Sequence, residues 1–153
     1  MRETVGHTFI IKVVVALTLL FSAFLVVAIN YNKVFRLKNQ VVSIIEKYEG
    51  VESGSYSLKV INNYLSTNNY KTMSKCPSGY MGTSTYGGTL EIANANKNYY
   101  YCVKKDVVYV KKVKTTEKKY IYNIILFYRL SIPLFGDMTT FEIKGQTKTI
   151  MYD

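Results

Sequence analysis

The sequence predicts an α+β protein in which a long N-terminal helix, half transmembrane and half amphipathic, packs on a C-terminal antiparallel sheet of about four strands. Three observations predict this class. The seventeen-residue run Val13–Ile29 carries no charge. The segment after it repeats apolar residues at helical spacing. The last third of the chain is rich in Tyr, Val, Ile and Thr, which suit strands. We expect a tail and transmembrane helix at 1–30 and one domain at 31–153.

The run Val13–Ile29 is long enough to be a membrane anchor. It spans about 25 Å, and Phe9–Ile11 with a snorkelling Lys12 extends it to the roughly 30 Å of a bilayer core. A cleaved secretory signal has a shorter apolar core followed by small residues, whereas Asn30–Asn32 follows this one. We therefore expect a single-pass helix that is retained and contacts membrane lipid.

The helix is predicted to continue beyond the membrane. Apolar residues three and four positions apart form one face, the predicted packing face: Val34, Leu37, Val41, Ile44, Ile45 and Tyr48. No Pro or Gly interrupts Thr8–Glu49, and Gly50 predicts the end of a rod of about forty residues. The same spacing fits two heptads, so a connector or coiled-coil stalk is the alternative.

A short second helix and four strands are expected next. Ser55 or Ser57 could cap the helix, with Leu58, Ile61, Tyr64 and Leu65 on its apolar face. Residues 71–97 resemble a loop. Strands are predicted at 98–104, 106–113, 119–130 and 139–152, with hairpin turns at KKD (104–106) and KTTEKK (114–119) and a longer connection at 131–138.

The two cysteines, Cys76 and Cys102, lie 26 positions apart and match no metal-ligand spacing. If the domain is outside the cytoplasm, a disulfide between them is expected, and two free thiols in a reducing compartment are the alternative. The positive-inside rule points the domain into the cytoplasm, but the cysteines and the Tyr-, Asn-, Ser- and Thr-rich composition favour the outside. We expect an extracytoplasmic domain; a cytoplasmic membrane regulator is the competing interpretation.

The chain has a net charge of +10, and nearly all of it follows the apolar run. The densest cationic feature is a set of lysines near two predicted hairpin ends: Lys104, Lys105, Lys111, Lys112, Lys114, Lys118 and Lys119. With the tyrosines beside them they could contact DNA or an anionic cell-wall polymer. Strand-edge lysines also keep sheets soluble, which is the simpler explanation. Arginine is rare, which argues against a sequence-specific DNA reader.

Catalysis is not expected. The only histidine is His7, at the membrane edge, so no Ser-His or Cys-His pair can form in the domain. The acids are scattered, and no spacing suggests a metal, a cofactor or a small-molecule substrate.

The order of a short basic tail, an apolar run, an amphipathic extension and a C-terminal sheet resembles type IV pilins and pseudopilins. More narrowly, FRLKNQVVSIIEKYEG (35–50), NNYKTMSKC (68–76), YYYCV (99–103) and FEIKGQTKTI (141–150) are similar to single-pass TadE-like proteins of tight-adherence pilus clusters in Gram-positive bacteria. The resemblance covers most of the chain in plan. It implies a non-catalytic component of a surface appendage or secretion system, located in the cell membrane or incorporated into a pilus. Its partners would be other pilin-like subunits, contacted through the N-terminal helix.

The pilin resemblance also indicates a role. Processed pilins have a Gly followed a few residues later by a Glu, whereas here Gly6 is followed by no acid in the run and Lys12 lies where an acid would be useful. The resemblance therefore implies a minor or tip component, or an uncleaved assembly factor, rather than a major fibre subunit.

Overall fold

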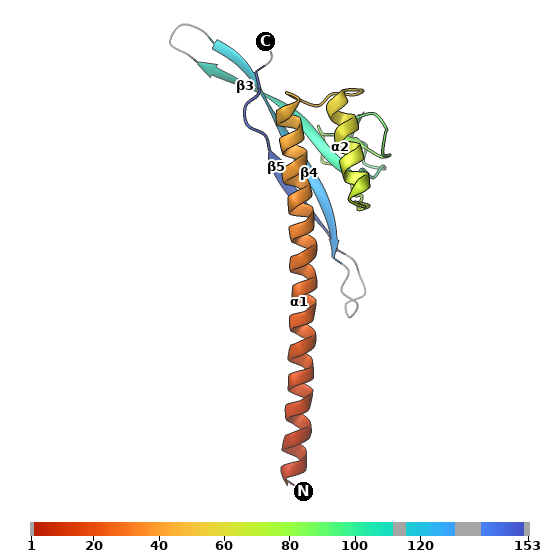
Figure 1. Cartoon of the computed structure of the whole chain (residues 1–153), viewed down its shortest axis with the longest axis vertical. Coiled ribbons are helices and arrows are strands. Elements are labelled where there is room, and N and C mark those ends of the chain that lie inside the picture. The colour runs from red at the N-terminus through yellow and green to blue at the C-terminus, as the bar shows by residue number, and fades with distance from the viewer. Residues whose placement is uncertain (1, 112–115, 131–138, 152–153) are drawn as a thin grey trace.

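Two helices and then five strands follow one another along the described chain (Figure 1). The computed structural model describes residues 2–111, 116–130 and 139–151. The elements are α1 (Arg2–Lys47), α2 (Tyr56–Thr67), β1 (Met81–Thr83), β2 (Glu91–Ile92), β3 (Tyr101–Lys111), β4 (Thr116–Leu130) and β5 (Thr139–Gln146). The predicted α+β class is confirmed: the long N-terminal helix packs on an antiparallel sheet, which has five strands instead of about four.

Helix α1 is continuous over 46 residues, since it contains no Pro and no Gly after its first turns. It ends in a tight turn in which the Gly50 N–H donates to the Ile45 carbonyl at 2.9 Å. Glu49 and Gly50 have φ values of 56° and 138°, which an L side chain rarely adopts and a glycine tolerates. The predicted stop at Gly50 is therefore confirmed.

The second half of α1 packs on the sheet through most of the predicted packing face. Its buried members are Val34, Leu37, Val41, Ile44 and Ile45. The assignment of Tyr48 to this face is wrong, because the helix ends at Lys47 and the Tyr48 ring lies 37% exposed, edge-on to Tyr56 at 5.3 Å between centroids. Since this half of α1 contacts β4 and β5, it is not a free coiled-coil stalk.

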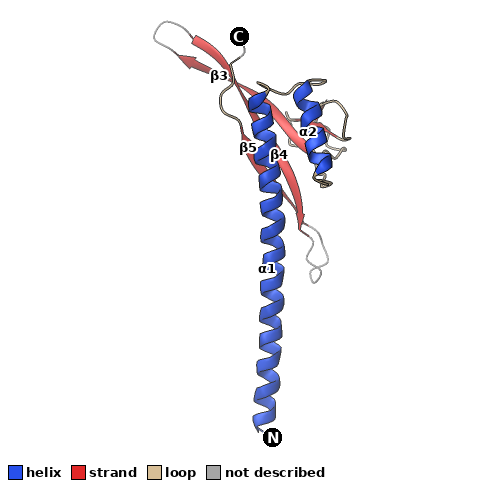
Figure 2. Cartoon of the chain, viewed as in Figure 1, coloured by secondary structure: helices blue, strands red, loops and turns tan. Residues whose placement is uncertain are grey.

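Helix α2 begins at the first of the two predicted caps. The Ser55 side-chain oxygen accepts a hydrogen bond from the Leu58 N–H at 3.3 Å. On the predicted apolar face Leu58, Ile61 and Leu65 are buried and Tyr64 is half-buried. The helix therefore covers the part of the sheet beside α1, as Figure 2 shows.

The sheet has the order β2-β1-β3-β4-β5, and all neighbouring strands are antiparallel. The 15-residue β4 pairs with β3 along one stretch and with β5 toward its C-terminal end. As a result, the far end of the β3–β4 pair projects beyond the C-terminal end of α1 (Figure 1). The last strand is shorter than predicted. After Gln146 the Thr147 N–H still donates to the Tyr122 carbonyl at 3.0 Å, and Ile150 exchanges two backbone hydrogen bonds with Tyr120.

The predicted hairpin turn at KKD is wrong. Strand β3 passes straight through Lys104, Lys105 and Asp106, which pair with residues of β4. The side chains of Lys104 and Asp106 share one face and form an ion pair at 2.9 Å, so both polar residues are accommodated within a strand. The predicted turn at 114–119 is wrong over residues 116–119, which belong to β4; its first two residues, and the predicted connection at 131–138, lie outside the described residues.

The two faces of the sheet bury different clusters. Tyr101, Val103 and Ile124 point to the helices and join the packing face of α1 in the larger core. The alternate residues of β3 and β4 point the other way, into a smaller cluster of Cys76, Tyr99, Cys102, Ile125 and Phe127. The sheet is therefore covered on one side by helices and on the other by the segment around Cys76.

Candidate functional site

The first half of α1 exposes apolar side chains on all its sides. These residues are Phe9, Ile10, Ile11, Val13, Val14, Val15, Leu17, Leu19, Leu20, Phe21, Phe24, Leu25, Val26 and Ile29. The two hydroxyls of the run are satisfied within the helix, since Thr18 donates to the Val14 and Val15 carbonyls and Ser22 to the Leu19 carbonyl. Of the described helices, only this one is long and apolar enough to cross a membrane.

A group of aromatic rings lies where α1 meets the sheet. Tyr31 lies edge-on to Tyr128 at 5.9 Å between centroids, and Tyr128 stacks on Phe141 at 5.1 Å. Phe35, one turn further along α1, stacks on Tyr31 at 6.1 Å. Amphipathic rings at the end of an apolar run are typical of a membrane–water boundary.

Cys76 and Cys102 form the predicted disulfide, with their Cα atoms 5.7 Å apart. The bond joins the start of the 71–97 segment to the centre of the sheet, where Cys102 is fully buried. On the loop-entropy account, closing a loop of 26 residues stabilises the fold by about 3 to 4 kcal/mol. Both cysteines are therefore structural, and neither is a free thiol.

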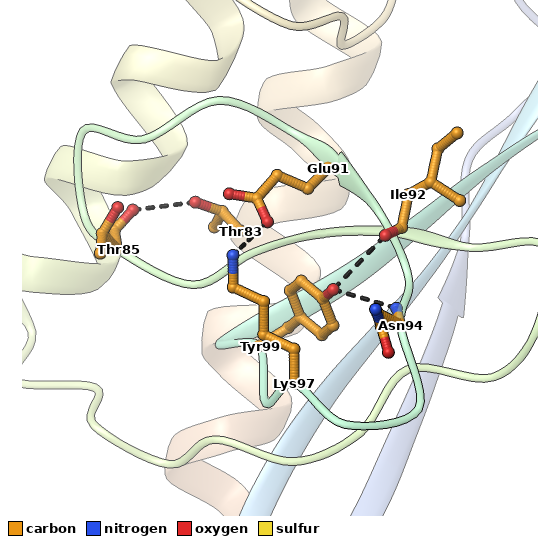
Figure 3. A network of polar contacts seen from close by, with 7 residues as sticks. All are labelled: Thr83, Thr85, Glu91, Ile92, Asn94, Lys97 and Tyr99. Carbon is orange, nitrogen blue, oxygen red and sulfur yellow. Dashed lines mark hydrogen bonds and ion pairs between the residues drawn. The ribbon is translucent and has the colours of Figure 1, made fainter.

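A network of polar contacts orders the glycine-rich part of the same segment (Figure 3). The Tyr99 hydroxyl accepts from the Asn94 N–H at 3.0 Å and lies 3.4 Å from the Ile92 carbonyl. Lys97 forms an ion pair with Glu91. Because the ring of Tyr99 lies against Gly82, β1 and β2 are held to the sheet by packing as well as by backbone pairing.

The predicted lysine surface is divided between the two faces of the β3–β4 hairpin. The strand alternation puts Lys104 and Lys119 on one face and Lys105 and Lys118 on the other. The ion pair with Asp106 raises the pKa of Lys104. Lys112 and Lys114 lie outside the described residues, as does the side chain of Lys111. The structure therefore does not bring the described lysines to one face.

The tyrosines next to these lysines are mostly unavailable for stacking. Tyr99, Tyr101 and Tyr122 are fully buried, and Tyr100 stacks on Tyr86 at 4.2 Å between centroids. Tyr109, at the projecting end, is 67% exposed. Lys105 instead lies 4.4 Å from the centroid of the Tyr120 ring and 3.1 Å from Glu52.

A basic groove, which the sequence did not predict, lies where α1 emerges from its apolar run. It consists of two adjoining cavities that share Lys33 and Leu37: a larger one of about 550 Å³ between α1 and the C-terminal end of α2, and a smaller one of about 130 Å³ between α1, residues 69–72 and the end of β4. Its cations, Lys33, Arg36, Lys71 and Arg129, come from three separate segments of the chain. No short sequence motif joins them, so only the fold could reveal this grouping.

The described residues contain no group of three or more His, Cys, Asp or Glu side chains placed to hold a metal ion. Comparison with known proteins gives no match: no family model, no curated protein and no solved structure is similar to the chain. The helix, the disulfide and the charged surfaces described above are therefore the features that indicate its function.

Proposed function

We propose that this chain is a membrane-anchored, pilin-like structural or assembly component of a bacterial surface appendage or secretion system, without catalytic activity. The observation that carries the proposal is α1, one continuous helix whose first half exposes apolar side chains on all sides and whose second half forms the core of an α+β domain. Such a helix couples a membrane or a helical bundle to a folded domain without a flexible joint.

The exposed run accounts for the membrane part of the proposal. Apolar surface left in water costs roughly 25 cal/mol per Å², so the fourteen exposed apolar side chains listed above need lipid or neighbouring helices around them. The side-chain hydroxyls of Thr18 and Ser22 donate to carbonyls of the same helix. This run therefore places no unpaired side-chain donor in an apolar environment. Other pilin-like helices are the partners we propose for this surface.

The disulfide supports an extracytoplasmic domain, because cytosolic thiols are normally kept reduced. The test is thiol labelling of intact cells with a membrane-impermeant reagent, with and without reductant. Labelling only after reduction is the expected result, and a Cys76→Ser, Cys102→Ser double variant gives the background. Labelling that needs broken cells and no reductant would contradict the proposed topology and favour a cytoplasmic regulator.

Helix-to-helix association can be tested with single cysteines in the run, because both native cysteines are bonded. Ala16→Cys and Ala23→Cys should give intermolecular disulfides in native membranes when an oxidant is added. Lys59→Cys, on the exposed surface of α2, is the matched control and should remain monomeric. No cross-link from either helix position would contradict association through α1 and leave only an anchor.

A tethered binding module for DNA or an anionic wall polymer is the second candidate. It is favoured by the projecting end of the β3–β4 hairpin, where Tyr109 is exposed and Lys118 lies 5.4 Å from the Tyr120 ring. Binding that falls steeply with salt and is lost in a Tyr109→Ala, Lys118→Gln variant would support it. Salt-independent retention of the polymer by that variant would contradict it.

A further inference from the structure

The basic groove lies at a defined height above the apolar run. Lys33 and Arg36 follow Ile29 by four and seven residues, which places their Cα atoms about 6 and 10 Å further along the helix axis. A bilayer of about 40 to 45 Å with a hydrocarbon core of about 30 Å has a head-group layer of roughly 5 to 8 Å on each side. With Ile29 at the edge of the core, the Cα atom of Lys33 lies within the head-group layer, and Arg36 lies just above it with a side chain that tilts back toward the N-terminus of the helix.

Nothing among the described residues neutralises the four cations of the groove. Lys33, Arg36, Lys71 and Arg129 are all exposed, and none of them forms an ion pair with a described residue. The described residues that line the groove include no Asp or Glu. Three of the cations line the smaller cavity and two line the larger one, with Lys33 common to both, and like charges gathered at such hollows favour an anion there.

The groove also offers hydrogen-bond donors and an apolar wall. Asn32 and Asn68 lie along it, and Tyr64 and Leu37 give it an apolar side. The C-terminal end of α2 points its carbonyls toward this region, which by itself disfavours an anion. The Asn68 amide donates to the Tyr64 carbonyl at 2.8 Å, so part of that unfavourable charge is already compensated within the helix end.

We propose that this groove binds the phosphate of an anionic phospholipid head group in the leaflet that faces the domain. Charge complementarity selects the phosphate, and each cavity has one guanidinium group, that of Arg36 in the larger and that of Arg129 in the smaller, whose planar donors suit phosphate oxygens. A lipid is favoured over another anion because the groove opens beside the end of the apolar run, where the acyl chains can remain in the bilayer. This inference rests on the membrane anchoring proposed above and adds a specific lipid partner to it.

The test uses the full chain in bilayers with equal amounts of phosphatidylglycerol and phosphatidylcholine. Electron paramagnetic resonance of spin-labelled lipids measures how much of each class is held at the protein. We expect phosphatidylglycerol to be preferred about fivefold, which corresponds to about 1 kcal/mol. A Lys33→Gln, Arg36→Gln, Lys71→Gln, Arg129→Gln variant should show equal association of both lipids.

The matched control removes four exposed charges at the other end of the domain: Lys47→Gln, Lys59→Gln, Lys118→Gln and Lys148→Gln. It should keep the preference. A groove variant that keeps the preference, or a control that loses it equally, would overturn the proposal and leave general surface charge or an acidic partner segment as the explanation.

All three proteins should resist alkaline extraction; a wild-type chain that is extracted would instead refute the anchoring itself. Near-UV circular dichroism verifies that both variants are folded.

Discussion

Tyr70 shows how a single side chain joins the segment after α2 to the sheet. Its hydroxyl accepts from the Phe127 N–H at 2.8 Å and lies 2.8 Å from the Phe127 carbonyl and 3.0 Å from the Tyr100 carbonyl. Tyr70→Phe removes the hydroxyl, and these buried backbone groups lose their hydrogen bonds to it. We expect the free energy of unfolding to fall by about 1 to 3 kcal/mol, measured by urea unfolding of the full chain in detergent micelles.

Tyr56→Phe is the control for this substitution, because the Tyr56 side chain is exposed. It should change the free energy of unfolding by no more than about 0.5 kcal/mol. Equal effects of the two substitutions would mean that the Tyr70 hydroxyl does not hold the sheet.

Buried tyrosines predict a specific response to alkaline pH. Burial raises the pKa of Tyr70 and Tyr101, and burial together with the nearby Tyr100 raises the pKa of Tyr86 to about 12. The folded state therefore favours the neutral phenols. Their contribution to stability is complete below the ordinary tyrosine pKa of about 10 and is lost as the pH rises through the folded pKa values.

The free energy of unfolding should therefore be flat near neutral pH and decline above about pH 10. Tyrosinate absorbance, followed together with near-UV circular dichroism, measures this. Tyr86→Phe should decline less than the wild type between about pH 10 and 12. Ionisation of all tyrosines near pH 10, with the folded spectrum unchanged, would contradict the burial of these rings.

At the scale of elements, β1 depends on a glycine. A Cβ at Gly82 would lie 2.6 Å from the Cγ of the buried Tyr99 ring, which is held by the disulfide-linked segment and cannot withdraw. Gly82→Ala should lower the free energy of unfolding by about 1 to 3 kcal/mol in the same urea assay. Gly145→Ala on β5 is the control, because its closest neighbour is the long, rotatable Lys38 side chain. A larger loss at Gly145 would contradict this packing.

The elements that the sequence predicted well are those with a strong period or a clear cap. The spacing from Val34 to Ile45 and the cap at Ser55 gave α1 and α2 correctly. The turn predicted at KKD failed because the charged side chains have partners within the folded domain: Lys104 pairs with Asp106, and Lys105 pairs with Glu52 and lies over the Tyr120 ring. Strands β1 and β2, of three and two residues, are too short for a period and are fixed by Tyr99 and the disulfide.

The candidate sites likewise include one that could be predicted from the sequence and others that could not. The disulfide could be predicted because the chain has only two cysteines. The single lysine surface could not, because neighbouring lysines in a strand alternate between faces, and the KKD error concealed that alternation. The basic groove depends on Lys71 and Arg129, which lie far from Lys33 in the sequence and meet it only after α2 and β4 have packed against α1.

At the scale of the whole molecule, α1 has two parts, and only the second of them belongs to the core. No described residue from Thr8 to Lys33 is buried, whereas the helix is buried on one face from Val34 onward. The apolar run therefore contributes nothing to the core, although it is long and apolar enough to cross a membrane. This separation predicts that the domain folds without its anchor.

A fragment of residues 31–153 should remain soluble without detergent, form the disulfide and keep the near-UV circular dichroism of the full chain. The cut before Tyr31 retains the ring contact with Tyr128 and every buried position of α1. The same fragment with Val41→Asp should fail to fold, because an unpaired carboxylate at this fully buried site is strongly destabilising. Size-exclusion chromatography and the urea midpoint measure both outcomes. An aggregated wild-type fragment, or a midpoint far below that of the full chain, would mean that the apolar run stabilises the domain directly and that α1 acts as one structural unit.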